Sequence, residues 1–406
     1  MSRTTKSLNP IRLSPTLALD HIDSIARKNG YAAHPHRRGV ISDWLHTPDQ
    51  IPHDGKEETR DIWREEILSL LMESVGAKDV AGALDWDGVP FPPPQNPEFR
   101  FCDFFAGIGG FRLALQNLNG KCVFSSEIDN TARRTYLTNF GEEPYGDIRD
   151  IAGKSREEIA ELVPDHDVLC AGFPCQPFSR AGVSARIFYG IQHGLDCEDQ
   201  GNLFFELMRI VDVKRPKVLF LENVRNLKIH DGGKTLAIIK KTIEGLGYSF
   251  SFKLLSSATK VPQNRVRCYM VCFLDYPEFE FKEFEGDVLP LKSVLEQDVP
   301  DVYTISDLLW DSHKKRSIRN KERNTGFIVR LADTSKPSNT LVARYGKDGK
   351  ECLIEQDGKN PRKLTPRECA RLMGFPDRAS GADREYVLPP RRTTAYRQFG
   401  NSISSF

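Results

Sequence analysis

Two short segments carry side chains suited to nucleophilic catalysis. Cys175 lies between Pro174 and Pro177, which stiffen the turn that presents the thiol. A cysteine in such a turn can act as a nucleophile where its thiolate is stabilised, whereas an isolated cysteine is more often a buried structural residue. Glu222 follows the apolar run 219–221, where partial burial would raise its pKa and let it donate a proton. The two residues together predict attack by a thiolate assisted by an acid.

A third segment, 263–267, brings two arginines close to a polar side chain. Alternation along a strand predicts that Gln263, Arg265 and Arg267 share one face. Two guanidinium groups on one face suit a carbonyl oxygen or a phosphate. A solvated charged face is the alternative reading of this pair taken alone.

A glycine-rich turn at 103–111 indicates a nucleotide-like cofactor. A strand runs into this turn and a helix follows, so the backbone can approach a ligand and offer free N–H groups. Glu127 ends the next predicted strand, where a carboxylate can hold ribose hydroxyls. Asp147 follows at the position expected for an adenine contact. A tight turn beside two surface acids is the alternative.

Short apolar strands that alternate with helices must position these residues. The predicted strands cover residues 100–105, 121–126, 167–173, 218–222 and 269–274, and the predicted helices include 111–118, 203–213 and 234–246. This alternation is typical of an α/β fold with a mostly parallel sheet. Ligands of such sheets bind at the C-terminal ends of the strands, where the candidate residues lie.

The remaining sequence predicts regions on both sides of this sheet. Residues 1–88 form a helical accessory region with helices after residue 15 and over 59–75, and residues 89–98 form a stiff Pro-rich linker. The sheet occupies 99–275. An irregular basic domain follows at 276–361, and residues 362–406 return to the sheet.

Composition narrows the class of protein. The 406 residues carry a net charge of +1, but residues 301–406 carry +8 and residues 1–300 carry −7, so an anionic partner is expected at one end. No apolar run reaches the length of a membrane helix, and residues 1–10 lack the apolar core of a signal sequence. These two features predict a cytoplasmic location without membrane contact. The nine cysteines include no CxxC pair, which favours reduced thiols over disulfides or a metal site.

The motifs resemble those of the DNA cytosine-5 methyltransferases, over residues 99–402. They occur in the family's order as DFFAGIGG, GFPCQPFS, ENV, QNRVR, RECARLMGFP and QFGNS. The blocks around Cys175 and Arg367 look most like bacterial Dcm-type and restriction-modification enzymes. The resemblance implies a Rossmann-like fold that binds S-adenosylmethionine (SAM), and a target cytosine flipped out of double-stranded DNA.

The resemblance also implies roles for individual residues. Cys175 would add to C6 of cytosine, Glu222 would protonate N3, Arg267 would hold O2 and Arg265 would support the site. The implied cofactor residues are Phe105, Gly107, Ile108, Gly110, Glu127, Ile128, Asp147, Ile148, Pro174, Leu203 and Asn401. The implied DNA contacts are Ser179, Gln263, Arg344 and Lys347. Arg344 and Lys347 lie in a region that resembles the recognition domain of enzymes that bind short C- and G-rich sites.

Departures from the family keep two alternatives open. Relatives continue past the last motif with an apolar helix that helps to hold SAM, so a chain ending at Phe406 is expected to fold with reduced SAM affinity. One alternative is therefore a truncated, inactive or regulatory DNA-binding relative, and the other is a tRNA cytosine-5 methyltransferase. The leading reading is a monomeric bacterial enzyme that a cognate restriction endonuclease for the same site could accompany.

Overall fold

The computed structural model describes most of the chain, with gaps. The described residues are 12–28, 36–46, 57–174, 203–275, 279–324, 326 and 328–405. The predicted nucleophile Cys175 and the predicted phosphate contact Ser179 lie outside them. Among the described residues, no helix is both long enough and apolar enough to cross a membrane.

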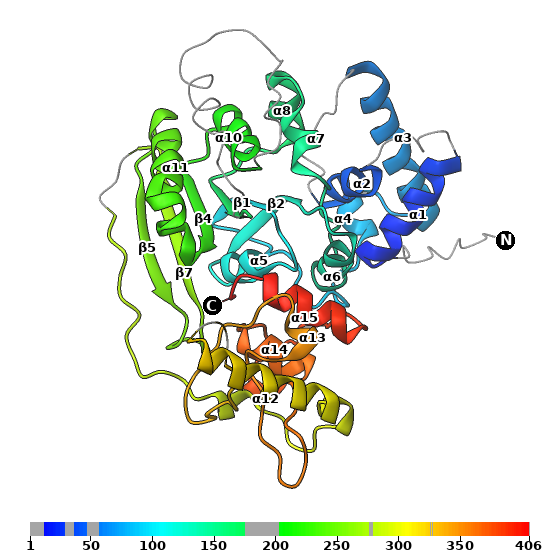
Figure 1. The fold of residues 1–406 in the computed structure, drawn as a ribbon. Coiled ribbons are helices and arrows are strands. Elements are labelled where there is room, and N and C mark those ends of the chain that lie inside the picture. The colour runs from blue at the N-terminus through cyan, green and yellow to red at the C-terminus, as the bar shows by residue number, and fades with distance from the viewer. Residues whose placement is uncertain are drawn as a thin grey trace, which may run out of the picture.

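A six-stranded sheet forms the centre of the molecule (Figure 1). Its order is β2-β1-β3-β4-β7-β5, and β7 alone runs antiparallel to its neighbours. The strands are β1 (Phe99–Phe104), β2 (Gly120–Ser126), β3 (Val168–Gly172), β4 (Val218–Val224), β5 (Ser251–Ser256) and β7 (Val266–Phe273). The predicted α/β class with a mostly parallel sheet is confirmed, although β5 was not foreseen.

Helices cover both faces of this sheet, as a parallel arrangement requires. Side chains alternate along each strand, so Phe101 of β1 packs with Phe111 of one helix, while Cys102 joins the larger core on the other face. The helices and 3₁₀ turns of this part are α5 (Gly110–Gln116), α6 (Asn130–Phe140), α7 (Ile148–Ala152), α8 (Arg156–Leu162), α10 (Leu203–Lys214), η2 (Arg225–Lys228), η3 (His230–Gly233) and α11 (Lys234–Gly245).

The N-terminal region packs as four helices beside α6 and the β2 edge of the sheet (Figure 1). They are α1 (Pro15–Lys28), α2 (Arg37–His46), α3 (Glu57–Val75) and α4 (Val80–Ala83). Their buried side chains belong to the same hydrophobic cluster as the core of the sheet. The sequence predicted α1 and α3, but not α2. The Pro-rich segment 89–98 lies against the sheet region, where the Phe91 ring stacks on Tyr386.

The basic region after residue 278 lies below the sheet in Figure 1. It contains η4 (Leu291–Val294), η5 (Asp301–Tyr303), α12 (Asp307–Glu322), β8 (Ser338–Asn339) and α13 (Tyr345–Asp348). β8 pairs with β6 (Gln263–Asn264) in a small parallel sheet. The return segment forms α14 (Pro366–Leu372), η6 (Arg378–Ser380) and α15 (Arg392–Asn401). The helix α12 was not foreseen, and His313 is its one buried side chain.

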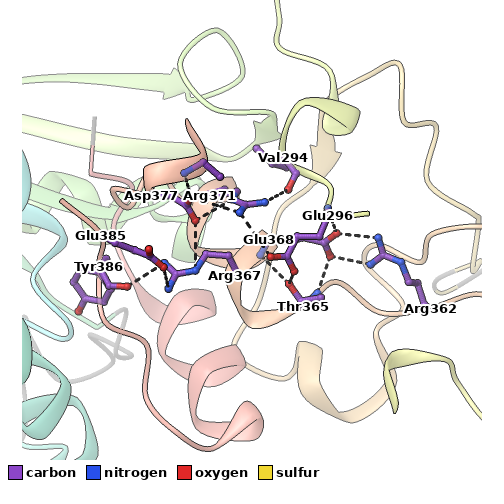
Figure 2. A network of polar contacts seen from close by, with 11 residues as sticks. Val294, Glu296, Arg362, Thr365, Arg367, Glu368, Arg371, Asp377, Glu385 and Tyr386 are labelled. Carbon is purple, nitrogen blue, oxygen red and sulfur yellow. Dashed lines mark hydrogen bonds and ion pairs between the residues drawn. The ribbon is translucent and has the colours of Figure 1, made fainter. Parts of the chain in front are cut away.

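A polar network around α14 joins the basic region to the return segment (Figure 2). Buried Glu368 accepts two hydrogen bonds of 2.8 Å from the Arg362 guanidinium and one of 2.8 Å from the Glu296 amide. On the next turn, Arg371 donates to Asp377 at 3.0 Å. A buried ion pair adds little net stability, but breaking it leaves an unpaired charge. The network therefore fixes where these segments meet.

Candidate active site

A cavity of about 400 Å³ opens at the C-terminal ends of the parallel strands. Such a position is the usual ligand site of an α/β sheet. Residues from the glycine-rich turn, β4, β7 and the return segment all contribute to one wall. Its lining includes Phe105, Gly107, Ile108, Gly110, Glu127, Asp129, Phe173, Pro174, Glu222, Asn223, Arg265, Arg267, Arg397, Gln398, Asn401 and Ile403.

The glycine-rich turn adopts a backbone that few side chains tolerate. Gly109 has φ of 84°, and Phe105 has φ of 57°, which is unusual for a residue with a bulky side chain. A Cβ on Gly110 would lie 2.5 Å from the Ile403 carbonyl oxygen, so the return segment approaches the start of α5 closely. The glycines therefore let main chain approach the cavity, whose lining also includes Phe105 and Ile108 of this turn.

Glu127 is held in place by backbone groups at the end of β2. Its carboxylate accepts from the Gly107 amide at 2.8 Å and from the Asp129 amide at 2.7 Å. Burial raises the pKa of this carboxyl, and the two amide hydrogen bonds oppose the increase. Two carboxylate oxygens offer about four lone-pair positions, so acceptor sites are left for hydroxyl groups of a ligand.

Glu222 and Arg267 form an ion pair within the cavity wall. Glu222 pairs with Gly172 of β3 on one side and with Tyr269 of β7 on the other. Its Oε1 lies 3.0 Å from Nε of Arg267. Burial raises the pKa of the Glu222 carboxyl, although Arg267 and Arg265 work in the opposite direction. A carboxyl in this environment is suited to hold and donate a proton.

Arg265 is a buried connection between the sheet and the return segment. Its guanidinium donates to the carbonyl oxygens of Leu341 at 2.9 Å, Gly400 at 3.3 Å and Ser402 at 2.6 Å. Burial lowers its pKa to about 9, and neighbouring Arg267 acts in the same direction. Arg265 therefore supports the cavity wall, while Arg267 presents its charge beside Glu222.

The described cysteines are poor candidates for a nucleophile. All seven are free and buried, at positions 102, 122, 170, 268, 272, 352 and 369. Burial raises the pKa of each thiol, which disfavours the thiolate. If these seven are set aside, Cys175 and Cys197 remain as candidates for the nucleophile among the nine cysteines of the chain.

Asn223 positions the chain that leads to Cys175. Its side-chain amide donates to the Phe173 carbonyl oxygen at 2.9 Å. Pro174, the last described residue before the gap, is exposed and lines the cavity. Cys175 therefore follows directly on a residue of the cavity wall. The sequence reading singled out Glu222 but gave Asn223 no role, although both belong to the ENV motif.

The cavity rim includes an ion pair that sequence reasoning missed. Arg397 of α15 lies 2.9 Å from the Asp129 carboxylate and donates to the Thr131 hydroxyl at 2.8 Å. The adjacent Gln398 donates to the Thr131 carbonyl oxygen at 2.9 Å. Both residues stand at the QFGNS motif, whose position near the cofactor could have suggested them.

The structure brings together most of the predicted cofactor residues, but not all. Ile128 is 63% exposed, and Ile148 is buried in the hydrophobic core. Asp147 caps the start of α7 and pairs with Arg149. These three residues and Leu203, which begins α10, are absent from the described cavity lining. Their predicted cofactor contacts stay predictions.

The stretch 263–267, which the sequence predicted to alternate as one strand, is divided between two strands. Gln263 belongs to β6, Arg267 belongs to β7, and Arg265 lies between the two strands. Gln263 is fully buried and exchanges hydrogen bonds with the Leu372 carbonyl oxygen at 3.0 Å and the Leu341 amide at 2.8 Å. In this arrangement it joins two segments instead of facing solvent. Arg344 and Lys347, the other described candidates for DNA contact, are exposed.

The family comparison agrees with this geometry. The family described as C-5 cytosine-specific DNA methylase matches residues 99–405. The chain belongs to this family, and it is therefore an enzyme of the DNA (cytosine-5) methyltransferase class. Its members are SAM-dependent methyltransferases. The matched residues begin at the first strand of the sheet, so the four N-terminal helices lie outside the match.

Three similar curated proteins come from bacteria. Type II methyltransferase M1.ScrFI of Lactococcus lactis subsp. cremoris is 45% identical over 323 residues, covering 78% of this chain and 77% of the relative. The DNA-cytosine methyltransferase of Escherichia coli is 40% identical over 367 residues, with coverage of 78% and 77%. Type II methyltransferase M.HhaI of Haemophilus parahaemolyticus is 40% identical over 329 residues, with coverage of 76% and 91%.

Solved structures share the fold. Spodoptera frugiperda DNMT2 superimposes with a TM-score of 0.57 at 20% identity, over 75% of this chain and 96% of that chain. The Entamoeba histolytica methyltransferase EhMeth gives a TM-score of 0.57 at 19% identity, over 76% and 95%. At this level of identity the likeness concerns the fold alone.

Proposed function

We propose that this enzyme transfers a methyl group from SAM to C5 of a cytosine flipped out of a short specific duplex DNA site, through a covalent adduct of Cys175. The observation that carries the proposal is a cavity, lined by described residues, in which a cofactor-type wall meets an acid. The glycine-rich turn and Glu127 form one part of its lining, and Glu222 with Arg267 forms another.

The described residues fit SAM chemically. Glu127 keeps acceptor positions for ribose hydroxyls, and the turn at Gly107 to Gly110 presents main chain to a ligand. Asn401 of α15 and Pro174 lie on the same cavity wall and would border the bound cofactor. When bound, SAM supplies an electrophilic methyl group. Asp147, Ile128, Ile148 and Leu203 belong to the proposal through the family resemblance alone.

The chain's own residues make the cytosine ring reactive. The Cys175 thiolate forms a bond to C6 while the Glu222 carboxyl gives its proton to N3, so the ring electrons move to C5. C5 would use this electron pair to take the methyl group, whose bond to the SAM sulfur would break to leave a neutral thioether. The C5 proton then leaves to water, the C6–sulfur bond breaks to release the thiolate, and N3 returns its proton to Glu222. Arg267 would hold the O2 atom, and its ion pair keeps Glu222 in position.

The basic region would bind the DNA around the flipped base. Arg344 lies in this region with a 59% exposed side chain, and exposed Lys347 follows on α13. Exposed cations of this kind contact phosphates or the edges of guanine. Ser179, which lies outside the described residues, would add a phosphate contact.

Covalent trapping on duplexes that contain 5-fluorocytosine tests the proposal. Fluorine at C5 cannot leave as a proton, so a methylated ring should stay bonded to Cys175. We expect a SAM-dependent, denaturation-resistant complex with duplex DNA and none with tRNA. The Cys175→Ser variant should form no complex, while Cys352→Ser, at a buried thiol in the basic region, should form it like the wild type. A complex that persists in Cys175→Ser would refute the assigned nucleophile.

A further inference from the structure

We infer that helix α2 of the N-terminal region is a positioning element of the cofactor site. It supports the segment 142–148, which lies beside Glu127 and carries Asp147. This inference rests on the proposed binding of SAM. The family match begins at residue 99, so the comparisons assign no role to α2. A continuous series of contacts runs from α2, through this segment, to the cavity wall.

Polar contacts first join α2 to Glu143. The Ser42 hydroxyl accepts a hydrogen bond of 2.8 Å from the Glu143 amide. The Arg38 guanidinium donates to the Glu143 carboxylate at 2.8 Å, and Arg133 of α6 reaches the other oxygen at 2.8 Å. The main chain and the side chain of Glu143 are therefore both held, and α2 contributes to each.

The two backbones also approach closely, which makes the contact sensitive to a single methyl group. A Cβ on Gly39 would lie 2.7 Å from Cα of Tyr145 and 3.2 Å from the Pro144 carbonyl oxygen. Just before α2, the His36 ring lies 4.7 Å from the Tyr145 ring. His36 also lies 2.5 Å from the Asp150 carboxylate of α7. The helix thus fits against this segment without space for a side chain at position 39.

The opposite side of the segment holds the cofactor wall. The Tyr145 amide donates to the Ser125 carbonyl oxygen at 2.8 Å, and the Ser126 hydroxyl donates to the Gly146 carbonyl oxygen at 2.7 Å. Ser125 and Ser126 end β2 directly before Glu127. Displacement of Tyr145 would therefore act on the residues that place the Glu127 carboxylate.

A second connection runs to the glycine-rich turn. Glu142 forms a two-point ion pair with Arg112, and both side chains are buried. Arg112 lies in the first turn of α5, which begins at Gly110 in the cavity wall. The segment 142–148 is thus attached to both cofactor-binding loops, with α2 packed behind it. An element so placed affects cofactor binding without touching the cofactor.

The test is the Gly39→Ala variant of the full chain, compared with Gly88→Ala. Alanine favours a helix over glycine, so α2 itself should form, but its new methyl group must push against Tyr145. Position 88 has no heavy atom within 4 Å of an added Cβ. By calorimetry, Gly39→Ala should weaken SAM binding on the order of tenfold. In methylation assays its KM for SAM should rise, whereas its KM for DNA and its kcat at saturating SAM should match the wild type.

A second pair of variants covers the case in which Gly39→Ala does not fold. Arg38→Ala removes the contact to Glu143 together with ion pairs to Asp20 and Asp23 of α1, whereas Arg27→Ala removes an ion pair to Asp23 that stays within α1. Only Arg38→Ala should weaken SAM binding and speed hydrogen exchange of the Tyr145 amide. Equal SAM affinity in the wild type, Gly39→Ala and Arg38→Ala would overturn the role of α2 and leave the proposed function intact. A wild type that binds no SAM would overturn both.

Discussion

At the scale of single residues, the environment of Glu222 separates it from an ordinary surface acid. Its carboxylate is buried, so its pKa is raised even though Arg267 lies 3.0 Å away. A raised pKa means that the protonated form persists to higher pH than in a free side chain, and it is lost as pH rises through the folded-state pKa. Proton donation to the base should therefore fail on the alkaline side.

The Glu222→Gln variant tests this proton transfer. Glutamine keeps a hydrogen-bond donor but cannot release a proton, so the single-turnover rate should fall by about 10²-fold or more. The wild-type rate, corrected for ionisation of Cys175, should decline as pH rises, and this decline should be absent in the variant. A pH profile of unchanged shape in Glu222→Gln would contradict the role of Glu222 as the acid.

Arg265 illustrates what residue types alone can and cannot predict. The sequence correctly placed Arg265 and Arg267 near one site, and both line the cavity. It did not predict the strand break between Asn264 and Val266, which divides this stretch between β6 and β7. Such a break depends on the pairing of β6 with β8, which is distant in the chain and invisible to local periodicity.

The Arg265→Lys variant should separate support from charge. Lysine keeps a cation but cannot reach the Leu341, Gly400 and Ser402 carbonyl oxygens together, so about 2 kcal/mol of unfolding free energy should be lost. Urea denaturation measures this loss. The Lys240→Arg variant, at an exposed position of α11, serves as the control and should unfold like the wild type. Identical midpoints for Arg265→Lys and the wild type would exclude the supporting role.

At the scale of elements, short-range patterns located strands and helices about equally well, since the predicted helices 111–118, 203–213 and 234–246 correspond to α5, α10 and α11. Apolar runs bounded by polar residues located β1 to β4 to within about two residues, since such runs are buried on both faces. The helix α2 was missed because its ten residues include few strong helix formers. Nearly all of these ten residues are buried, and this tertiary packing stabilises the helix. α12 was missed because its sequence is mostly polar and its apolar residues Leu308 and Ile318 are exposed, so no apolar stripe marks a buried face.

The return segment supports the glycine-rich turn through the hydroxyl group of Tyr386. Tyr386 is fully buried, and its hydroxyl donates to the Ile108 carbonyl oxygen at 2.7 Å. Its own carbonyl oxygen accepts from Arg367 in the network of Figure 2. Nothing in the sequence distinguishes Tyr386 from a core tyrosine, because its partner lies 278 residues earlier in the chain.

The Tyr386→Phe variant should weaken SAM binding about three- to tenfold, because the Ile108 carbonyl oxygen loses a hydrogen bond worth about 1 kcal/mol. Calorimetric titration with SAM measures the change. Tyr248→Phe is a matched control, since this buried tyrosine also donates to a carbonyl oxygen at 2.7 Å, but to Pro216 at the start of β4. A similar effect of both variants on SAM affinity would indicate general destabilisation instead.

At the scale of the whole molecule, positive charge is concentrated in the part of the chain that follows the central sheet. The excess of +8 falls in residues 301–406, which form much of the region below the sheet. The glycine-rich turn and Glu127, which form part of the cofactor wall, lie in the acidic part of the chain. Because the net charge of the whole chain is only +1, electrostatic attraction to DNA should come from one side of the molecule. This attraction should weaken as the salt concentration rises.

The double variant Arg344→Ala/Lys347→Ala tests whether this side binds DNA. If both cations contact phosphates, the slope of log Kd against log salt should decrease by about two, and affinity should fall for every duplex sequence. If Arg344 contacts a base instead, affinity should fall selectively for duplexes that contain the sequence the enzyme methylates. SAM affinity should be unchanged, because neither residue lines the described cavity. Lys240→Ala/Lys241→Ala on α11 removes the same charge from another surface, so an equal loss of DNA affinity there would refute a localised DNA-binding face.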